Sequence, residues 1–192
     1  GPGGRLNGAN TLRVFLLDYL GAVDPKAASD AAVVVLSRLE APDEWAVNLR
    51  NFARANPSPE SRNFLRDRVR LLLTHEPWRQ TPSAGYLEAF DVAVHIGGGQ
   101  LVPELTRLLR LTNHQAVAHA ASLALDRLVI NDPVPVLSAL DNDASLMEGR
   151  DSVRAGYFAR ADASDLEQRR MLESYLLNPV RGQDELKTFA DL

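Results

Sequence analysis

Hydrophobic residues along the chain recur at intervals of three and four, which is the period of an amphipathic helix. The first such group is Leu12, Phe15, Leu16 and Tyr19. Alternation of apolar and polar residues, typical of a half-buried strand, is almost absent. The valines at 33–35 could be interpreted as a strand, but the residues on either side favour a helix. The pattern therefore predicts an all-α protein.

Prolines indicate where the helices begin. Pro25, Pro42 and Pro59 are spaced by 17 residues, and Pro77 follows after 18. Proline is favoured in the first helical turn, and each of the first three stands beside a residue that can cap a helix. An interval of this length fits a helix of about three turns and a short connection. The predicted helices span residues 10–21, 24–40, 43–55, 59–76, 84–96, 100–111, 113–130, 133–141, 147–160, 164–177 and 183–191.

Short connections make neighbouring helices antiparallel. The sequence predicts a single helical-repeat domain over residues 5–192, with an irregular break at 76–83 that contains two prolines. Residues 1–4 resemble the scar left by a protease that removes an expression tag. Three glycines at 97–99 are expected to end a helix, and they lack the Lys-Ser/Thr that follows in a phosphate-binding loop.

The second half of the chain carries motifs of a known repeat family. Residues 101–111 are rich in leucine, and 113–125 begin with Asn and contain several alanines. A second unit ends in the string Asp-Ser-Val-Arg-Ala at 151–155. Over residues 100–177 the chain therefore resembles HEAT or armadillo-like repeats.

The resemblance implies a fold and a role for two residues. Antiparallel helix pairs would stack as a short right-handed α-solenoid, the HEAT-like arrangement. Asp151 and Arg154 would have a structural role, because in that family such residues tie adjacent repeats together. Arrays of this kind mostly present extended surfaces to other proteins. The resemblance thus implies a scaffold.

Composition excludes several classes of function. The formal charge is −4, which disfavours non-specific binding to nucleic acid. No stretch approaches the roughly 20 apolar residues of a membrane-spanning helix, so we expect a soluble protein without membrane insertion. The chain has no cysteine, so disulfides, thiolate metal sites and cysteine nucleophiles are ruled out.

One helix carries a candidate metal site. Glu88, Asp91 and His95 lie at i, i+3 and i+7, so all three can project from one face, as in half of a di-iron site. Such a site needs a matching Glu-x-x-His on a facing helix, and the sequence contains none. A solvated face with an Asp91–His95 pair is the preferred interpretation. Nucleophile motifs are also missing, so we expect no metal, no cofactor and no catalytic residue.

A basic stripe is the main candidate for binding a partner. Arg62, Arg66 and Arg70 lie at i, i+4 and i+8, and Arg50 and Arg54 on the preceding helix could widen the patch. Arginine suits carboxylates and phosphates, so an acidic or phosphorylated partner would bind here. The alternative, which we favour, is an ordinary solvated face paired with nearby acids.

The two tryptophans suggest different roles. Trp45 follows two acidic residues in the first turn of a helix and is expected to anchor packing. Trp78 lies in the irregular break, where partial exposure would make it the better candidate for an interface.

The leading hypothesis is a non-enzymatic helical-repeat scaffold that mediates protein–protein interaction. Its partner would be another protein, possibly an acidic one, or a second copy of itself, and not nucleic acid. The alternative is an enzyme or small-molecule binder with a cleft between helices near residues 75–100.

Overall fold

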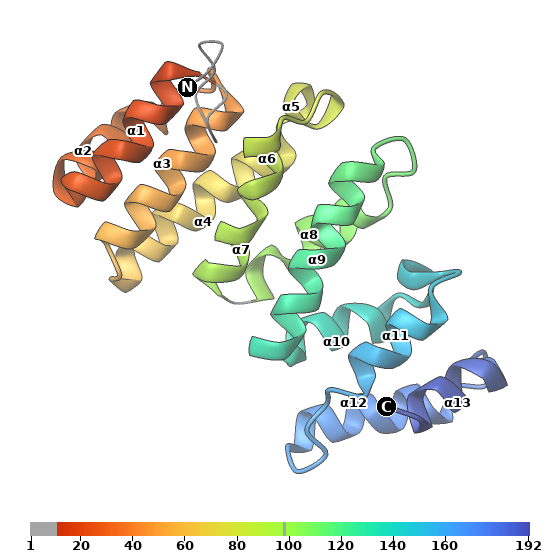
Figure 1. The fold of residues 1–192 in the computed structure, drawn as a ribbon. Helices are drawn as coiled ribbons and strands as arrows, with labels where there is room; N and C mark the ends of the chain where they lie inside the picture. The colour runs from red at the N-terminus through yellow and green to blue at the C-terminus, as the bar shows by residue number, and fades with distance from the viewer. Residues whose placement is uncertain (1–10, 98) are drawn as a thin grey trace. The chain divides into compact units, whose positions relative to one another are not determined.

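The computed structural model describes residues 11–97 and 99–192. All regular structure in these residues is helical, and no strand occurs among them (Figure 1). The all-α prediction is therefore confirmed. The suspected scar at residues 1–4 lies outside the described residues.

The chain divides into two compact units. The first ends at Ile96, and the second comprises Gly97–Leu192. Each unit is described by itself below. The single domain over 5–192 and the right-handed solenoid both stay predictions.

The first unit contains seven labelled helices within its described residues, several of them short. They are α1 (Leu12–Val23), α2 (Pro25–Val35), α3 (Pro42–Ala55), α4 (Pro59–Thr74), α5 (Glu76–Gln80), α6 (Ala84–Glu88) and α7 (Phe90–Ile96).

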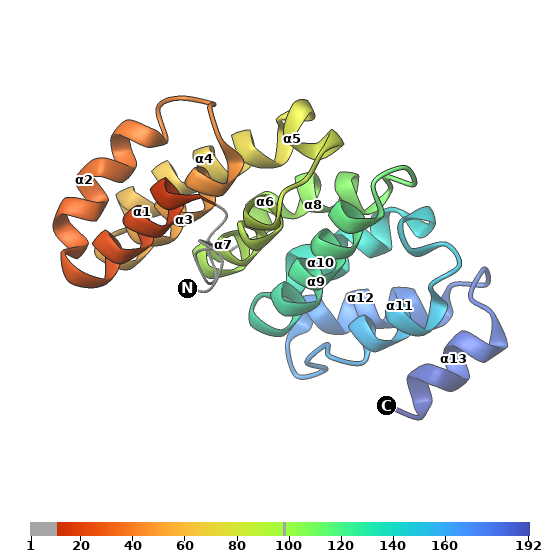
Figure 2. The same cartoon turned by 45° about the horizontal axis from the view of Figure 1, so that its top comes forward.

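Helix α3 forms the centre of this unit. It packs against α1, α2, α4, α6 and α7, and α1, α2 and α4 lie alongside it in Figures 1 and 2. Three of its large side chains, Trp45, Leu49 and Phe52, are buried. Even its amides Asn48 and Asn51 are buried, because neighbouring helices cover this helix on most sides. The position of each surrounding helix is thus set by its contact with α3.

Prolines begin the helices as predicted. Pro25, Pro42 and Pro59 are the first residues of α2, α3 and α4. Asp24 caps α2 by accepting a hydrogen bond from the backbone of Ala27. Ser58 caps α4 in the same way.

Asp43, the potential capping residue beside Pro42, does not cap α3. The N-cap residue of α3 is Ala41, which makes no side-chain cap bond. The carboxylate of Asp43 instead accepts hydrogen bonds from the hydroxyl of Ser83 and from the backbone N–H of Gly85, at 3.0 Å for the latter. A side chain of α3 therefore holds the beginning of α6.

In the first unit, one predicted helix ends early and another is interrupted. The helix expected over 24–40 ends at Val35, although residues 33–35 are helical as predicted. The carbonyl of Arg38 accepts a hydrogen bond of 2.6 Å from the indole of Trp45. The helix expected over 84–96 is interrupted at Ala89, where α6 gives way to α7. Within 76–83, residues 76–80 form the short helix α5.

The second unit begins at Gly97, whose φ of 70° is the left-handed conformation that glycine adopts easily after a helix. Helix α10 occupies its centre and contacts α8, α9, α11 and α12, while α13 packs on α11. The elements are the 3₁₀ turn η2 (Gly99–Leu101), α8 (Val102–Leu109), α9 (Gln115–Asn131), α10 (Pro133–Asn142), the 3₁₀ turn η3 (Ala144–Met147), α11 (Asp151–Phe158), α12 (Leu166–Leu177) and α13 (Gln183–Ala190).

Candidate functional site

The predicted basic stripe lies on α4 and is partly engaged within the chain. Arg62 is exposed, whereas Arg66 and Arg70 are half-buried. Arg66 donates a hydrogen bond of 3.0 Å to Asn63, and Arg70 lies 3.8 Å from the carboxylate of Asp67. Of the three arginines, Arg62 is therefore the exposed one, and the other two contact residues of their own helix.

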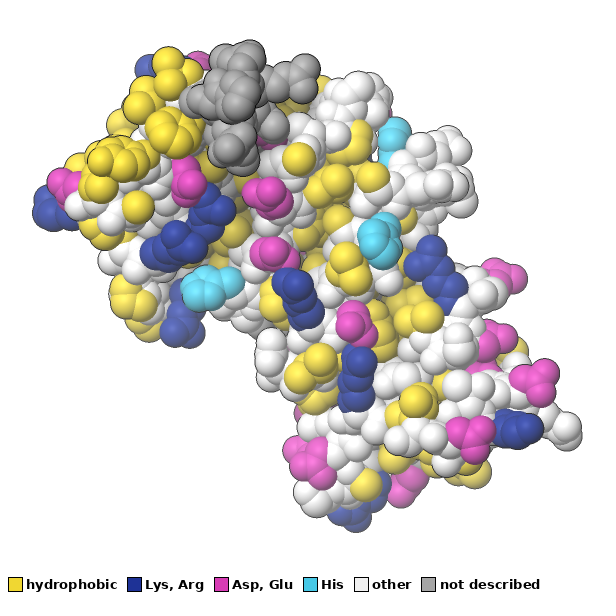
Figure 3. Space-filling model, in the orientation of Figure 1, with side chains coloured by type: hydrophobic (Ala, Val, Ile, Leu, Met, Phe, Trp, Pro, Cys, Tyr) yellow, Lys and Arg dark blue, Asp and Glu magenta, His cyan; other side chains and the backbone are white. Residues whose placement is uncertain are grey.

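Arg50 and Arg54, which were expected to widen the stripe, instead line a groove between α3 and the helices α6 and α7. Arg50 and Arg54 form one wall with Ala46 and Ala53, and Arg50 pairs with Asp18 of α1 at 2.6 Å. Figure 3 shows basic and histidine side chains close together over this part of the first unit. The groove has a volume of about 560 Å³, and its other wall consists of Glu88, Asp91, Val92 and His95.

Glu88, Asp91 and His95, the candidate metal ligands, thus share a wall of this groove. Across residues 11–97 and 99–192, no group of three or more His, Cys, Asp or Glu side chains is placed to hold a metal ion. All three are exposed at the rim, while Ala46, Ala53 and Val92 are buried beneath them. The groove therefore combines an apolar floor with charged walls of both signs.

The expected exposure of Trp78 is wrong. Its side chain is only 7% exposed. It packs against Trp45 with ring centroids 5.4 Å apart and against His75 at 4.4 Å. Trp45 is buried, as predicted for a packing anchor. Trp78 belongs to the interior of the first unit because α5 folds back onto α4 there.

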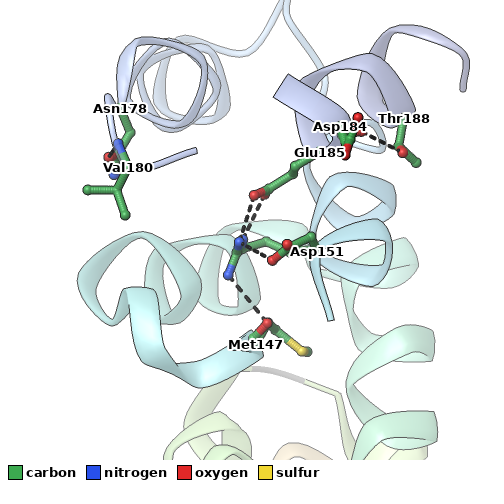
Figure 4. Close-up of polar contacts among 8 residues, drawn as sticks. Met147, Asp151, Asn178, Val180, Asp184, Glu185 and Thr188 are labelled. Atoms are coloured by element: carbon green, nitrogen blue, oxygen red, sulfur yellow. Dashed lines mark hydrogen bonds and ion pairs between the residues drawn. The ribbon is translucent and has the colours of Figure 1, made fainter. Parts of the chain in front are cut away.

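Arg154 is the centre of a buried ion-pair cluster in the second unit. Its guanidinium donates two hydrogen bonds to the carboxylate of Glu185, at 2.7 and 2.6 Å. It also bonds Asp151 at 2.7 Å and the carbonyl of Met147 at 3.4 Å. Figure 4 shows Glu185 of α13 and Asp151 of α11 pointing toward the same guanidinium. The pair joins α11 to α13.

The two acidic partners of Arg154 differ in how far they are buried. The side chain of Glu185 is 1% exposed, but that of Asp151 is 57% exposed. Burial by itself raises the pKa of Glu185. The two hydrogen bonds and the positive charge of Arg154, together with the positive charge of Arg181, outweigh burial and bring this pKa below its usual value. The Arg154–Glu185 pair is therefore charged in the folded protein and holds the C-terminal helix in place.

One side of α1 carries several exposed apolar side chains. Leu12, Leu16, Tyr19 and Val23 are each more than half exposed. At 3.6 residues per turn they fall within an arc of roughly 60°. Phe15, at the edge of this arc, is stacked on Tyr19 with centroids 6.4 Å apart. We call Leu12, Leu16, Tyr19 and Val23 the α1 stripe; in Figure 3 hydrophobic side chains gather over α1.

Helix α1 packs on the unit through its opposite face. Gly21 lies so close to Asn51 of α3 that a Cβ atom there would be 2.2 Å from the amide oxygen. The amide nitrogen of Asn51 donates to the carbonyl of Leu17 at 2.9 Å. Val14 is the buried residue of this helix. Because a glycine and a backbone carbonyl form the contact with α3, the large apolar side chains point away from it.

Two of these features were missed by sequence reasoning. The apolar spacing of α1 predicts a helix, but it does not show that the apolar face is exposed. The pairing of Arg154 with Glu185 spans 31 residues and leaves no local signal. The burial of Arg154 on α11 and of Glu185 on α13 indicates the pairing, but burial is known only once the fold is known.

Searches of protein-family models, curated proteins and solved structures found no match to this chain. The helices of the described residues all fall short of the length and apolar content needed to cross a bilayer.

Proposed function

We propose that this protein is a non-enzymatic helical-repeat scaffold, with helices stacked in a HEAT-like manner, that mediates protein–protein interaction. The observation that carries the proposal is the α1 stripe, whose four members are 53–60% exposed. Soluble folds rarely leave a contiguous patch of large apolar side chains uncovered unless it is an interaction site. The resemblance to HEAT repeats supports the same function, since such arrays mostly serve as binding surfaces.

The orientation of α1 strengthens this interpretation. A surface helix normally turns its apolar face toward the core. Here the close contact of Gly21 with Asn51 fixes the opposite orientation. Exposed apolar residues also occur in the second unit, for example Leu166 and Leu177 on α12. On that helix charged residues occupy the positions between them, whereas the α1 stripe is uninterrupted.

The test is a capture experiment with the whole chain and one matched pair of variants. Leu16→Glu places a charge in the centre of the α1 stripe. Leu177→Glu makes the same change at a side chain that is 81% exposed in the second unit. We expect wild type and Leu177→Glu to retain the same bound proteins, identified by mass spectrometry, and Leu16→Glu to lose at least one of them. Identical sets for all three chains would overturn the proposal.

A second candidate function rests on the groove between α3 and the pair α6 and α7. Its volume of about 560 Å³ is in the range of small-molecule sites, and its charged walls could orient a polar ligand. The test is a thermal-shift screen with metabolites. A rise in melting temperature with one compound, abolished by Arg54→Ala but not by Arg62→Ala, would favour a small-molecule binder over the scaffold.

A further inference from the structure

The α1 stripe has a symmetric spacing. Its members, Leu12, Leu16, Tyr19 and Val23, are separated by four, three and four residues. This is the alternation of positions d and a in a heptad repeat. Read from either end, the spacing is the same. A helix with such a stripe matches itself when a second copy lies alongside in the opposite direction.

We propose that the α1 stripe pairs with the α1 stripe of a second copy of this chain, as two antiparallel helices related by a two-fold axis. This inference rests on the proposed function and names the partner. Around the axis, Leu16 would pack against Tyr19 of the other copy, and Leu12 against its Val23. A two-fold interface needs a patch that is complementary to itself, and the symmetric spacing supplies one.

The charges around the stripe favour a copy over a charged partner. The nearest charged side chains already have partners within the chain: Arg13 lies 3.1 Å from Glu44, and Asp18 lies 2.6 Å from Arg50. The first 96 residues contain eleven basic and eleven acidic side chains, so two copies meet without net repulsion between their first units. The members of the stripe carry no charge, so they favour neither an acidic nor a basic partner.

The size of the stripe predicts how tight the pairing is. Aromatic side chains bury about 150–250 Å² each when fully covered. The four stripe members and Phe15 are each about half exposed, so they offer roughly 400–500 Å² on each copy. Standard stable interfaces bury about 800 Å² per partner. The stripe offers about half of that area, so we expect the pairing to be a weak, reversible dimer.

The first test is the oligomeric state of the whole chain, measured by sedimentation velocity from low micromolar to several hundred micromolar concentration so that a weak dimer is detected. We expect wild type and Leu177→Glu to shift from monomer to dimer, and Leu16→Glu to stay monomeric. Leu16→Gln, which adds no charge, should weaken the dimer and guards against an effect of charge alone. A monomer throughout this range for wild type would overturn the inference.

The second test measures the direction of the helices. The chain contains no cysteine, so single cysteines can be introduced without background. Under mild oxidation, a mixture of Leu12→Cys and Val23→Cys chains should form disulfide-linked heterodimers, and neither chain alone should form homodimers to a similar extent. Homodimers of each chain, without heterodimers, would indicate parallel helices and contradict the inference.

Different results would overturn the self-pairing and the proposed function. If wild type is monomeric but Leu16→Glu still loses a captured protein, the partner is another protein and only the inference of self-pairing is wrong. If Leu16→Glu loses helical circular dichroism, the stripe is part of the interior and the proposed function is wrong as well.

Discussion

Removal of the Arg154 guanidinium should strongly destabilise the second unit. Arg154→Ala leaves the carboxylate of Glu185, which is 1% exposed, without its two hydrogen bonds and its counter-charge. Breaking a buried ion pair by removing one partner typically costs about 3–5 kcal/mol. Asp151→Ala removes a partner that is 57% exposed, so it should cost about 1 kcal/mol or less.

A double variant separates the loss of the pair from the stranding of its partner. In Arg154→Met with Glu185→Leu, both charges are replaced by apolar groups of similar length. Such replacements are often neutral or stabilising, so the double variant should be more stable than Arg154→Ala. Urea denaturation followed by circular dichroism gives the free energies of unfolding. Because the chain forms two compact units, amide hydrogen exchange in α11 and α13 should locate the loss.

Two outcomes would refute this reasoning. The first is an Arg154→Ala variant that unfolds at the same urea concentration as Asp151→Ala, which would mean that the bond to Glu185 contributes nothing beyond the exposed pair. The second is faster exchange in α3 and α4 of the first unit with no change in α13.

Three further predictions follow from other contacts. The free energy of unfolding should fall as the pH drops below about 4.3, the usual pKa of a glutamate. Glu185, whose pKa is lowered in the folded protein, stabilises the fold only while it is charged. A melting temperature that rises on acidification would contradict this. Gly21→Ala should lower stability by about 1–3 kcal/mol, because the new methyl group meets Asn51, whereas the helix propensity of alanine alone would raise it. Reversing Arg62 and Arg66 to Glu should slow association with an acidic partner and leave the helical signal intact; surface plasmon resonance at two salt concentrations tests this, and a molten double variant would show that the arginines act within the fold.

The helices could be predicted because their signals are local. Proline in the first turn and a capping residue before it depend only on neighbouring residues, and Pro25 and Pro59 begin helices as expected. The end of α2 could not be predicted. Ala41 precedes Pro42 and is extended, and the carbonyl of Arg38 is bonded to Trp45 seven residues further on. Contacts of this kind depend on the tertiary structure.

The candidate sites were harder to predict than the helices. Periodicity identifies an apolar face on α1, but it does not say whether another helix covers that face. The contact between Gly21 and Asn51 decides this, and it joins two residues that are 30 positions apart in the chain. For Trp78 the prolines around it suggested exposure, yet Trp45 and His75 surround it in the structure. The structural role predicted for Arg154 agrees with its burial, although its main partner was not foreseen.

The bond from Asp43 to the start of α6 has a consequence for the order of folding. A helix of five residues is too short to persist in water by itself, since nucleation costs more than so few hydrogen bonds return. Its first turn is closed by a carboxylate that lies 40 residues earlier than Ser83 in the chain. Helix α6 can therefore form only after α3 is in place and the loop between them has closed. The folding nucleus should therefore consist of α3 and the longer helices packed against it, and α6 should form after the transition state.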